Sequence, residues 1–253
     1  MVDYEVNGHY AVLTINRPEA RNAVNGAVAN GIEEGIDKLE ADDDLWVGIL
    51  TGVPPVFCAG ADLKEINSGN AGGLQTKRGG FGGIVQRERE KPIIAAVDGP
   101  ALAGGTEIVL SCDLVVASRS ATFGIPEVKR SLVAAAGGLF RLPRKIPFNI
   151  AMECALTGDP ITAERAYQFG LVNVLCEDGE ALAKATELAD RVCANAPIAV
   201  RETRRIMLTA TNAPDDVGWK MSSEAMLKAV GTEDFSEGLT AFIEKRPPVW
   251  KGR

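Results

Sequence analysis

The stretch from Lys91 to Glu127 reads KPIIAAVDGPALAGGTEIVLSCDLVVASRSATFGIPE and decides the fold. The apolar residues 93–97 are typical of a buried strand, and residues 98–100 (Asp-Gly-Pro) indicate a turn after it. The small residues 101–105 then open a helix, whose first N–H groups have no partner within the helix. Such a helix start favours negative charge, because free donors and the helix dipole both point toward it.

Two carboxylates lie close to this predicted helix start. Glu107 falls in the first turn of the helix, and Glu127 follows a short β-like run at 122–125 and a proline. Backbone donors and two carboxylates that converge on one cleft can polarise a carbonyl group while protons move beside it. The alternatives are that Glu107 only satisfies the helix N-terminus and that Glu127 is an ordinary surface residue.

Composition and charge exclude several classes of function. The 253 residues are 46% hydrophobic, which suffices for one large domain or for a core with a smaller appendage. The net charge of −7 argues against non-specific nucleic-acid binding, which needs a basic face. The sequence starts without a signal-peptide pattern and contains no run of 18 apolar residues, so we expect a cytoplasmic protein that does not enter membranes.

The histidine and cysteine content limits the available chemistry. The single histidine, His9, lies in a predicted hairpin turn, so we expect neither a histidine-dependent triad nor a multi-histidine zinc site. The five cysteines are scattered and form no CxxC pair, which is typical of reduced thiols. An enzyme of this composition must work with carboxylates and backbone amides, and we expect no metal and no redox cofactor.

The residues before the deciding stretch predict a hairpin, a helix and a strand. Residues 4–16 form the hairpin, Asn22 is expected to cap a helix over about 24–40, and 46–51 are an apolar strand. Residues 67–83 contain seven glycines and few large apolar groups. They predict a mobile surface loop, which is either a plain connector or a flap over a substrate.

The C-terminal part is predicted to be almost entirely helical. Helical patterns at 147–156 and 162–169 precede a strand at 171–175. The change of pattern places a boundary near Pro197, which gives a core of residues 1–196 and a C-terminal helical region of residues 197–253. Four further helices are predicted, at 178–194, 197–211, 215–229 and 233–244.

Seven short motifs along nearly the whole chain carry a resemblance to a known family. They are NRP at 16–18, FCAGADL at 57–63, the segment Gly99 to Cys112, FGIPE at 123–127, LTG at 156–158, GLV at 170–172 and AFIEKR at 241–246. Each motif is modest alone, but their order and spacing are specific. Together they resemble the enoyl-CoA hydratase (crotonase) superfamily.

The resemblance implies an α/β fold, a right-handed crotonase-like spiral of ββα units with a helical C-terminal trimerisation region. Trimers of this family often pair into hexamers, so a homotrimer or a hexamer is expected. Family members bind acyl-CoA thioesters and stabilise a thioester enolate with two backbone N–H groups. Coenzyme A is part of the substrate, and the resemblance implies no separate cofactor.

The resemblance also implies the site residues. The two oxyanion-hole N–H groups match Ala61 and Gly104, and the two catalytic glutamates of the hydratases match Glu107 and Glu127. The implied reaction adds water across the 2,3 double bond of a 2-enoyl-CoA. Glu107 is expected to orient and deprotonate the water, and Glu127 to deliver a proton to C2. The substrate-binding residues are expected to be Ala23, Ala59, Gly60, Asp62, Leu63, Lys64 and Gly105.

The sequence departs from the hydratases at one loop. Residues 131–136, SLVAAA, stand where hydratases have a glycine- and proline-containing loop that lines the acyl pocket, so the acyl group is not identified. The alternatives are an enoyl-CoA isomerase or thioester hydrolase, and a non-catalytic acyl-CoA-binding or RNA-associated scaffold. The paired acids argue against the scaffold, and the net negative charge argues against RNA. Asp113, at the end of the predicted helix, is expected to be structural.

Overall fold

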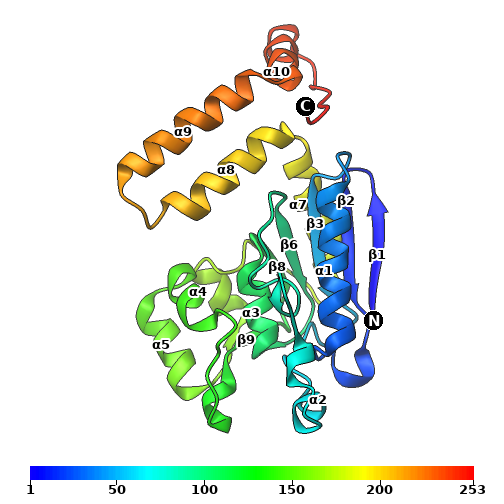
Figure 1. The fold of residues 1–253 in the computed structure, drawn as a ribbon, viewed down its shortest axis with the longest axis vertical. Coiled ribbons are helices and arrows are strands. Elements are labelled where there is room, and N and C mark those ends of the chain that lie inside the picture. Colours follow the sequence, from blue (N-terminus) through cyan, green and yellow to red (C-terminus); the bar gives the residue numbers. More distant parts are fainter.

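A six-stranded sheet forms the centre of the protein in a computed structural model that describes residues 1–253 (Figure 1). The strand order is β1-β2-β3-β6-β8-β11, and only β1 and β2 pair antiparallel. The strands are β1 (Val2–Asn7), β2 (Tyr10–Ile15), β3 (Val47–Gly52), β6 (Ile93–Val97), β8 (Leu114–Ser118) and β11 (Val174–Cys176).

Both faces of the central strands are covered by helices. β3 and β6 are buried along their whole length, as parallel strands between two helical layers require. Leu50 of β3 packs in one apolar cluster with Ile32 of α1 (Gly26–Ala41). The neighbouring Ile49 points to the other face and packs in a second cluster with Ala185 of α7 (Ala181–Cys193).

A second sheet, of order β10-β9-β7, brings the two predicted catalytic segments together. Its strands are β7 (Ala101–Leu102), β9 (Thr122–Gly124) and β10 (Ile161–Thr162). β7 leads into α3 (Gly104–Ser111), and β9 leads into the 3₁₀ helix η3 (Pro126–Arg130). β7 and β9 pair in parallel, so their carboxyl ends lie at the same edge of the sheet.

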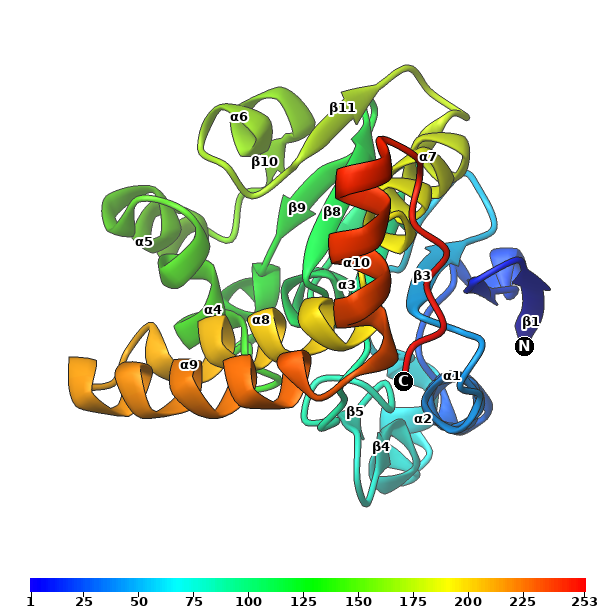
Figure 2. The ribbon, with the colours of Figure 1, turned by 90° about the horizontal axis from the view of Figure 1, so that it is seen from above.

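The C-terminal helices project from this core. α8 (Pro197–Ala210) and α9 (Asp215–Val230) lie side by side as a helical hairpin, and α10 (Glu233–Glu244) follows them (Figures 1 and 2). None of the helices is both long and apolar enough to cross a membrane. The boundary at Pro197 coincides with the start of α8, and its meaning as a domain boundary stays a prediction. The remaining helices are α2 (Leu63–Asn67), α4 (Gly138–Lys145), α5 (Phe148–Thr157) and α6 (Ala163–Gln168).

The predicted cap of α1 was wrong. Asn25, not Asn22, caps this helix, and its side-chain oxygen accepts a hydrogen bond from the Val28 N–H at 2.9 Å. The Asn22 amide is buried and donates to the carbonyl groups of Val53 and Val56 at 2.8 and 2.6 Å. The Asn22 side chain therefore links its own loop to the loop at 53–56. It is engaged there and does not cap α1.

The glycine-rich segment 67–83 contains regular secondary structure from residue 71 to residue 81. It contains η2 (Ala71–Leu74) and the short hairpin of β4 (Gln75–Thr76) and β5 (Gly80–Phe81). The hairpin packs on α1, because Gly79 N–H donates to Glu33 at 2.8 Å. A Cβ atom on Gly83 would lie 2.1 Å from the Ala29 carbonyl oxygen. These glycines therefore permit close approach to α1, and residues 75–81 form a hairpin where the sequence predicts a loop. That the segment is mobile and acts as a flap over the substrate stays a prediction.

Candidate active site

Two loop-to-helix junctions touch at the start of α3. The Leu102 N–H donates to the Cys58 carbonyl at 3.0 Å, which places the FCAGADL loop beside β7. A Cβ atom on Gly60 would lie 3.0 Å from the Gly104 nitrogen, and one on Gly105 only 2.1 Å from the Cys58 oxygen. Both positions therefore require glycine, since a side chain would separate the two backbones.

The N–H groups of Ala61 and Gly104 make no hydrogen bond within the protein. Ala61 forms a parallel bridge with Val24, and in this bridge Val24 bonds to the flanking Gly60 and Asp62 at 2.8 and 2.9 Å. Gly104 is the first residue of α3, so its N–H has no acceptor within the helix. Two free donors on touching backbones can hold the oxygen of a carbonyl group as it gains negative charge.

A strained turn sets the start of α3. Ala103 has φ 52° and ψ −127°, a left-handed conformation that costs a residue with a side chain about 1–3 kcal/mol. Its N–H donates to the Gly124 carbonyl at 2.8 Å. The buried Thr106 hydroxyl accepts from the Gly124 N–H at 3.0 Å and lies 2.7 Å from the Ala101 carbonyl. These contacts with β7 and β9 hold the turn and thereby aim the Gly104 N–H.

The Glu107 carboxyl group is almost completely buried, with 3% of the residue exposed. Its Oε1 accepts a hydrogen bond from the Gly138 N–H at 2.9 Å. Burial raises the pKa of Glu107 to about 7, although the Gly138 hydrogen bond opposes this rise and the negative charge of Glu127 adds to it. A carboxyl group with a pKa near neutrality can both accept and release a proton under physiological conditions.

Glu127 lies just after the neighbouring strand β9, and it directly follows Pro126 in η3. Its Oε2 atom is buried and has no hydrogen-bond partner in the protein. Burial raises the pKa of this carboxyl group as well. A buried carboxyl oxygen without a partner is unusual in a folded protein and is available to a bound water or substrate. The structure thus places two carboxyl groups with raised pKa values near each other, and the charge of Glu127 acts on the pKa of Glu107.

Asp62 uses its carboxylate within the protein. It caps α2 by accepting from the Lys64 N–H at 2.9 Å, and its Oδ2 lies 2.6 Å from a guanidinium nitrogen of Arg17. Burial would raise the pKa of Asp62, but the hydrogen bonds from Arg17 and from the Lys64 N–H hold it below its usual value. Asp62 therefore positions the Ala61 loop, and a direct contact of its carboxylate with substrate stays a prediction.

The other residues predicted to bind substrate differ in accessibility. Leu63 and Lys64 are exposed on α2, so both are available to a ligand. Ala59 is half-buried and donates its N–H to the Arg21 carbonyl at 3.1 Å. Ala23 is buried, and its carbonyl accepts from Arg17 at 3.0 Å. Their substrate contacts remain predictions.

Two contacts around the site could not be predicted from the sequence. Phe81, from the glycine-rich hairpin, covers the start of α3, and a Cβ atom on Gly104 would lie 2.3 Å from its ring. Gly138, at the start of α4, supplies the hydrogen bond to Glu107. The paired glycines at 137 and 138 were the only sequence signal for the second contact, and a lone phenylalanine between glycines gave none for the first.

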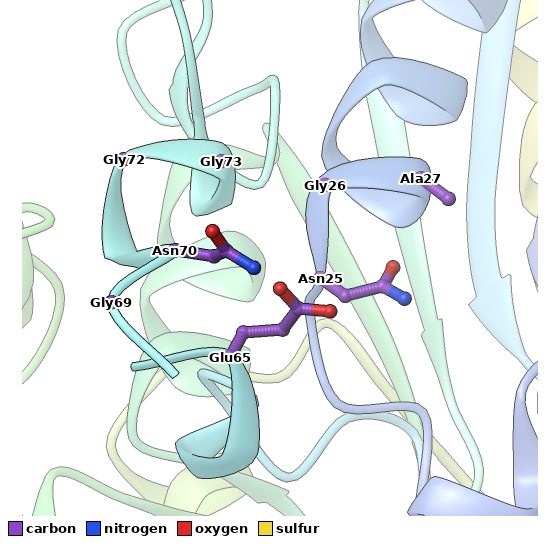
Figure 3. A pocket seen from close by; sticks show the side chains of 8 residues that line it. All are labelled: Asn25, Gly26, Ala27, Glu65, Gly69, Asn70, Gly72 and Gly73. Carbon is purple, nitrogen blue, oxygen red and sulfur yellow. The ribbon is translucent and has the colours of Figure 1, made fainter. Parts of the chain in front are cut away.

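An open hollow of about 570 Å³ lies beside the start of α1, and Figure 3 shows the side chains of Glu65 and Asn70 pointing across it. Neither predicted glutamate nor either oxyanion residue lines this hollow, so it is separate from the reacting centre. No cluster of three or more histidine, cysteine or acidic side chains is arranged to hold a metal ion. The lining residues are Asn25, Gly26, Ala27, Glu65, Gly69, Asn70, Gly72 and Gly73.

Comparison with known proteins identifies the family. The sequence profile described as enoyl-CoA hydratase/isomerase matches residues 5–253. The chain belongs to the enoyl-CoA hydratase/isomerase family. It is 40% identical to the enoyl-CoA hydratase EchA19 of Mycobacterium tuberculosis, over 98% of this chain and 96% of that one. It is also 40% identical to the mevalonyl-coenzyme A hydratase sidH of Aspergillus fumigatus, over 96% of this chain and 92% of that one.

Solved structures of the family agree with the fold. An enoyl-CoA hydratase from Mycobacterium tuberculosis superposes with a TM-score of 0.96 at 47% identity, covering 100% of this chain and 99% of that one. The predicted membership of the crotonase superfamily, the α/β fold and the enoyl-CoA hydratase activity are thereby confirmed. The protein is an enzyme of the hydratase class.

Proposed function

We propose that this hydratase adds water across the 2,3 double bond of a 2-enoyl-CoA and releases a 3-hydroxyacyl-CoA, with Glu107 and Glu127 as its catalytic residues. The proposal rests above all on one observation. The buried Glu107 and the half-buried Glu127 have carboxyl groups with raised pKa values, and both follow adjacent parallel strands beside two free backbone N–H groups. Such an arrangement serves a reaction in which charge forms on a carbonyl oxygen while protons are transferred next to it.

The first task is to hold charge on the thioester oxygen. When water attacks C3, electrons move through the double bond onto this oxygen, and the N–H groups of Ala61 and Gly104 would receive it. One oxyanion donor typically contributes roughly 10²–10³-fold to the rate. The dipole of α3 has the same sense, because the oxygen would lie at the N-terminus of the helix.

The second task is to move two protons. Glu107, in its ionised form, would take a proton from the water as its oxygen bonds to C3. Glu127, in its protonated form, would give a proton to C2 of the enolate. The product gains the elements of water and nothing is oxidised, so this reaction requires neither a redox cofactor nor a metal, and coenzyme A enters only as part of the substrate.

We propose that the enzyme works in the cytoplasm as a homotrimer or as a hexamer formed from two trimers. The C-terminal helices expose large apolar side chains, among them Trp219 (75% exposed), Leu227 (75%) and Phe242 (85%). Isolated exposed apolar residues are common, but a concentration of them on projecting helices favours a protein interface. Light scattering tests this point, since a monomer at micromolar concentration would contradict it.

The reaction itself is tested with a panel of 2-enoyl-CoA and 3-hydroxyacyl-CoA thioesters, assayed in both directions. The panel covers short, long and ring-bearing acyl groups, because residues 131–136 leave the acyl pocket undefined. Reversible hydration of at least one thioester, lost in Glu107→Gln, supports the proposal. Migration of a double bond without hydration would instead identify an isomerase, and release of free CoA a thioester hydrolase.

A further inference from the structure

Arg141, on α4, joins three segments around Glu107. Its guanidinium group donates to the Val85 carbonyl at 2.5 Å, two residues after the glycine-rich segment. It also donates to the Ala136 carbonyl at 3.4 Å, in the loop before α4. Arginine offers five N–H groups in a planar fork, so one side chain can hold several carbonyl groups at once.

The loop that Arg141 holds is the loop that contacts Glu107. A Cβ atom on Gly137 would lie 2.6 Å from a guanidinium nitrogen of Arg141, so the guanidinium lies directly against this turn. The backbone N–H of Arg141 donates to the Gly137 carbonyl at 2.9 Å, an ordinary bond of the first helical turn that does not depend on the side chain. The next residue, Gly138, donates its N–H to Glu107. Movement of Arg141 would therefore displace the hydrogen bond that orients the Glu107 carboxyl.

The positive charge of Arg141 also acts on Glu107. After burial and the Gly138 hydrogen bond, the charges acting on the pKa of Glu107 are Glu127 from η3, which raises it, and Arg141 from α4, which lowers it. Around Arg141 itself lie the cations Arg89 and Arg144 and the groups Glu107 and Cys112. Burial lowers the pKa of Arg141, but an arginine stays protonated in proteins. Arg141 is thus the cation that opposes the effects of burial and Glu127 on Glu107.

We propose that Arg141 is a positioning residue of the hydration reaction, which holds the 136–138 backbone against the Glu107 carboxyl and places a positive charge near this carboxyl. The proposal rests on the proposed function in one respect, namely that Glu107 is the group that deprotonates the water. The contacts and the charge make separable predictions, because Arg141→Lys keeps the charge without the planar fork and Arg141→Gln removes the charge.

The test measures the ionisation of Glu107 directly, by NMR of protein labelled with ¹³C at the glutamate carboxyl carbons. Glu107→Gln assigns the signal. In Arg141→Gln the Glu107 titration should move to higher pH, because the opposing cation is lost. In Arg141→Lys the Glu107 titration should move to higher pH by a smaller amount. Arg144→Gln is the matched control, since Arg144 lies on the same helix against the same Phe140 ring but is exposed.

Kinetics give the second readout. With Glu107 acting as a base, the acidic limb of the kcat profile should follow its titration. For each pH unit by which the Glu107 titration moves upward, kcat at pH values below this limb should fall about tenfold. Arg141→Lys should lower kcat at every pH, with a smaller movement of the limb, and thermal melting should verify that each variant is folded.

An unchanged Glu107 titration in both folded Arg141 variants would overturn the proposal. If Arg141→Gln does not fold, the Glu107 titration and kcat of Arg141→Lys test the proposal. Values of both that equal those of the parent protein would overturn the proposal. A parent protein that hydrates no enoyl-CoA, but whose Glu107 titration still responds to Arg141, would refute the proposed function and leave the Arg141–Glu107 coupling intact.

Discussion

Arg204 Nε and Asp113 Oδ1 lie 2.9 Å apart, although 91 residues separate them in the sequence. The other Asp113 oxygen accepts from Arg89 at 2.9 Å and from the Ile93 N–H at 2.8 Å. Asp113 lies two residues after α3 ends, so one carboxylate ties this end of the Glu107 helix to β6 and to α8. The structural role predicted for Asp113 is confirmed.

Replacement of Asp113 by asparagine should strongly destabilise the protein. Two largely buried arginines would lose their partner, and such a loss typically costs about 3–5 kcal/mol. Burial raises the pKa of Asp113, but Arg89 and Arg204 outweigh it and hold this pKa below its usual value. The contribution should therefore be complete above about pH 4, the usual pKa of an aspartate, and be lost as the pH falls through the lower pKa of the folded state.

Urea unfolding measures this contribution, and Asp159→Asn is the control. Asp159 pairs with Lys129 at 2.5 Å on the surface, where an ion pair contributes about 1 kcal/mol or less. Equal unfolding free energies for the two variants would contradict the structural role of Asp113.

Ionisation of Glu107 should lower the free energy of unfolding at high pH. Because its pKa is raised to about 7 in the folded protein, the folded state binds a proton that the unfolded chain releases near pH 4.3. The free energy of unfolding should therefore fall as the pH rises from about 4 through 7, by on the order of 3 kcal/mol. Glu107→Gln removes this loss, so the variant should be more stable than the parent at pH 8 and show a much smaller advantage at pH 5.

Urea unfolding of both proteins at the two pH values checks this expectation. Glu34→Gln, an exposed position on α1 without an ion pair, should change stability little at either pH. A Glu107→Gln variant that is less stable at pH 8 than at pH 5, relative to the parent, would show that the carboxyl group is not destabilised by its burial. An active site that gives up stability in this way is common among enzymes.

Local patterns account for what could be predicted from the sequence. The β6 strand, the turn after it and the start of α3 depend on neighbouring residues, and so does the register that puts Glu107 in the first helical turn. The cap of α1 could not be predicted in this way. Asn22 and Asn25 have the same side chain, and the carbonyl groups of Val53 and Val56, about thirty residues away, decide which one caps.

Contacts between distant segments account for the rest. Phe81 against Gly104 and Gly138 against Glu107 depend on how the hairpin and α4 pack on α3, which no single stretch specifies. The glycines of 74–83 illustrate the same limit. Their number predicts a mobile loop, but it does not show that Gly83 is needed because the Ala29 carbonyl leaves no room for a side chain.

The two glutamates should act as a unit. Glu107→Gln and Glu127→Gln preserve shape and remove the ionisable group, and each should lower kcat roughly 10²–10⁴-fold with little change in KM. The double variant should lose much less than the product of the two single losses, because both residues act on the same reaction coordinate. An isomerase should depend on one acid far more than on the other. Steady-state kinetics at saturating thioester distinguish these outcomes.

Gly104 and Gly105, at the start of α3, contact different groups, so the same substitution at each should respond differently to loss of the Phe81 ring. Gly104→Ala places a methyl group 2.3 Å from the Phe81 ring, and Gly105→Ala places one 2.1 Å from the Cys58 carbonyl oxygen. Both should lower kcat, because each forces the oxyanion donors apart. The Phe81 ring, on the last residue of β5, can be removed by substitution, whereas a backbone carbonyl cannot.

Phe81→Ala should therefore restore part of the activity of Gly104→Ala and none of that of Gly105→Ala. The measurement is a pair of double-mutant cycles in kcat/KM, with Phe81→Ala alone as the common reference. A coupling free energy of roughly 0.5–3 kcal/mol is typical of residues in contact, and we expect it for the first pair alone. Equal coupling for both pairs would mean that Phe81 acts on the whole junction through the hairpin, and that its contact with Gly104 does not set the position of the donor.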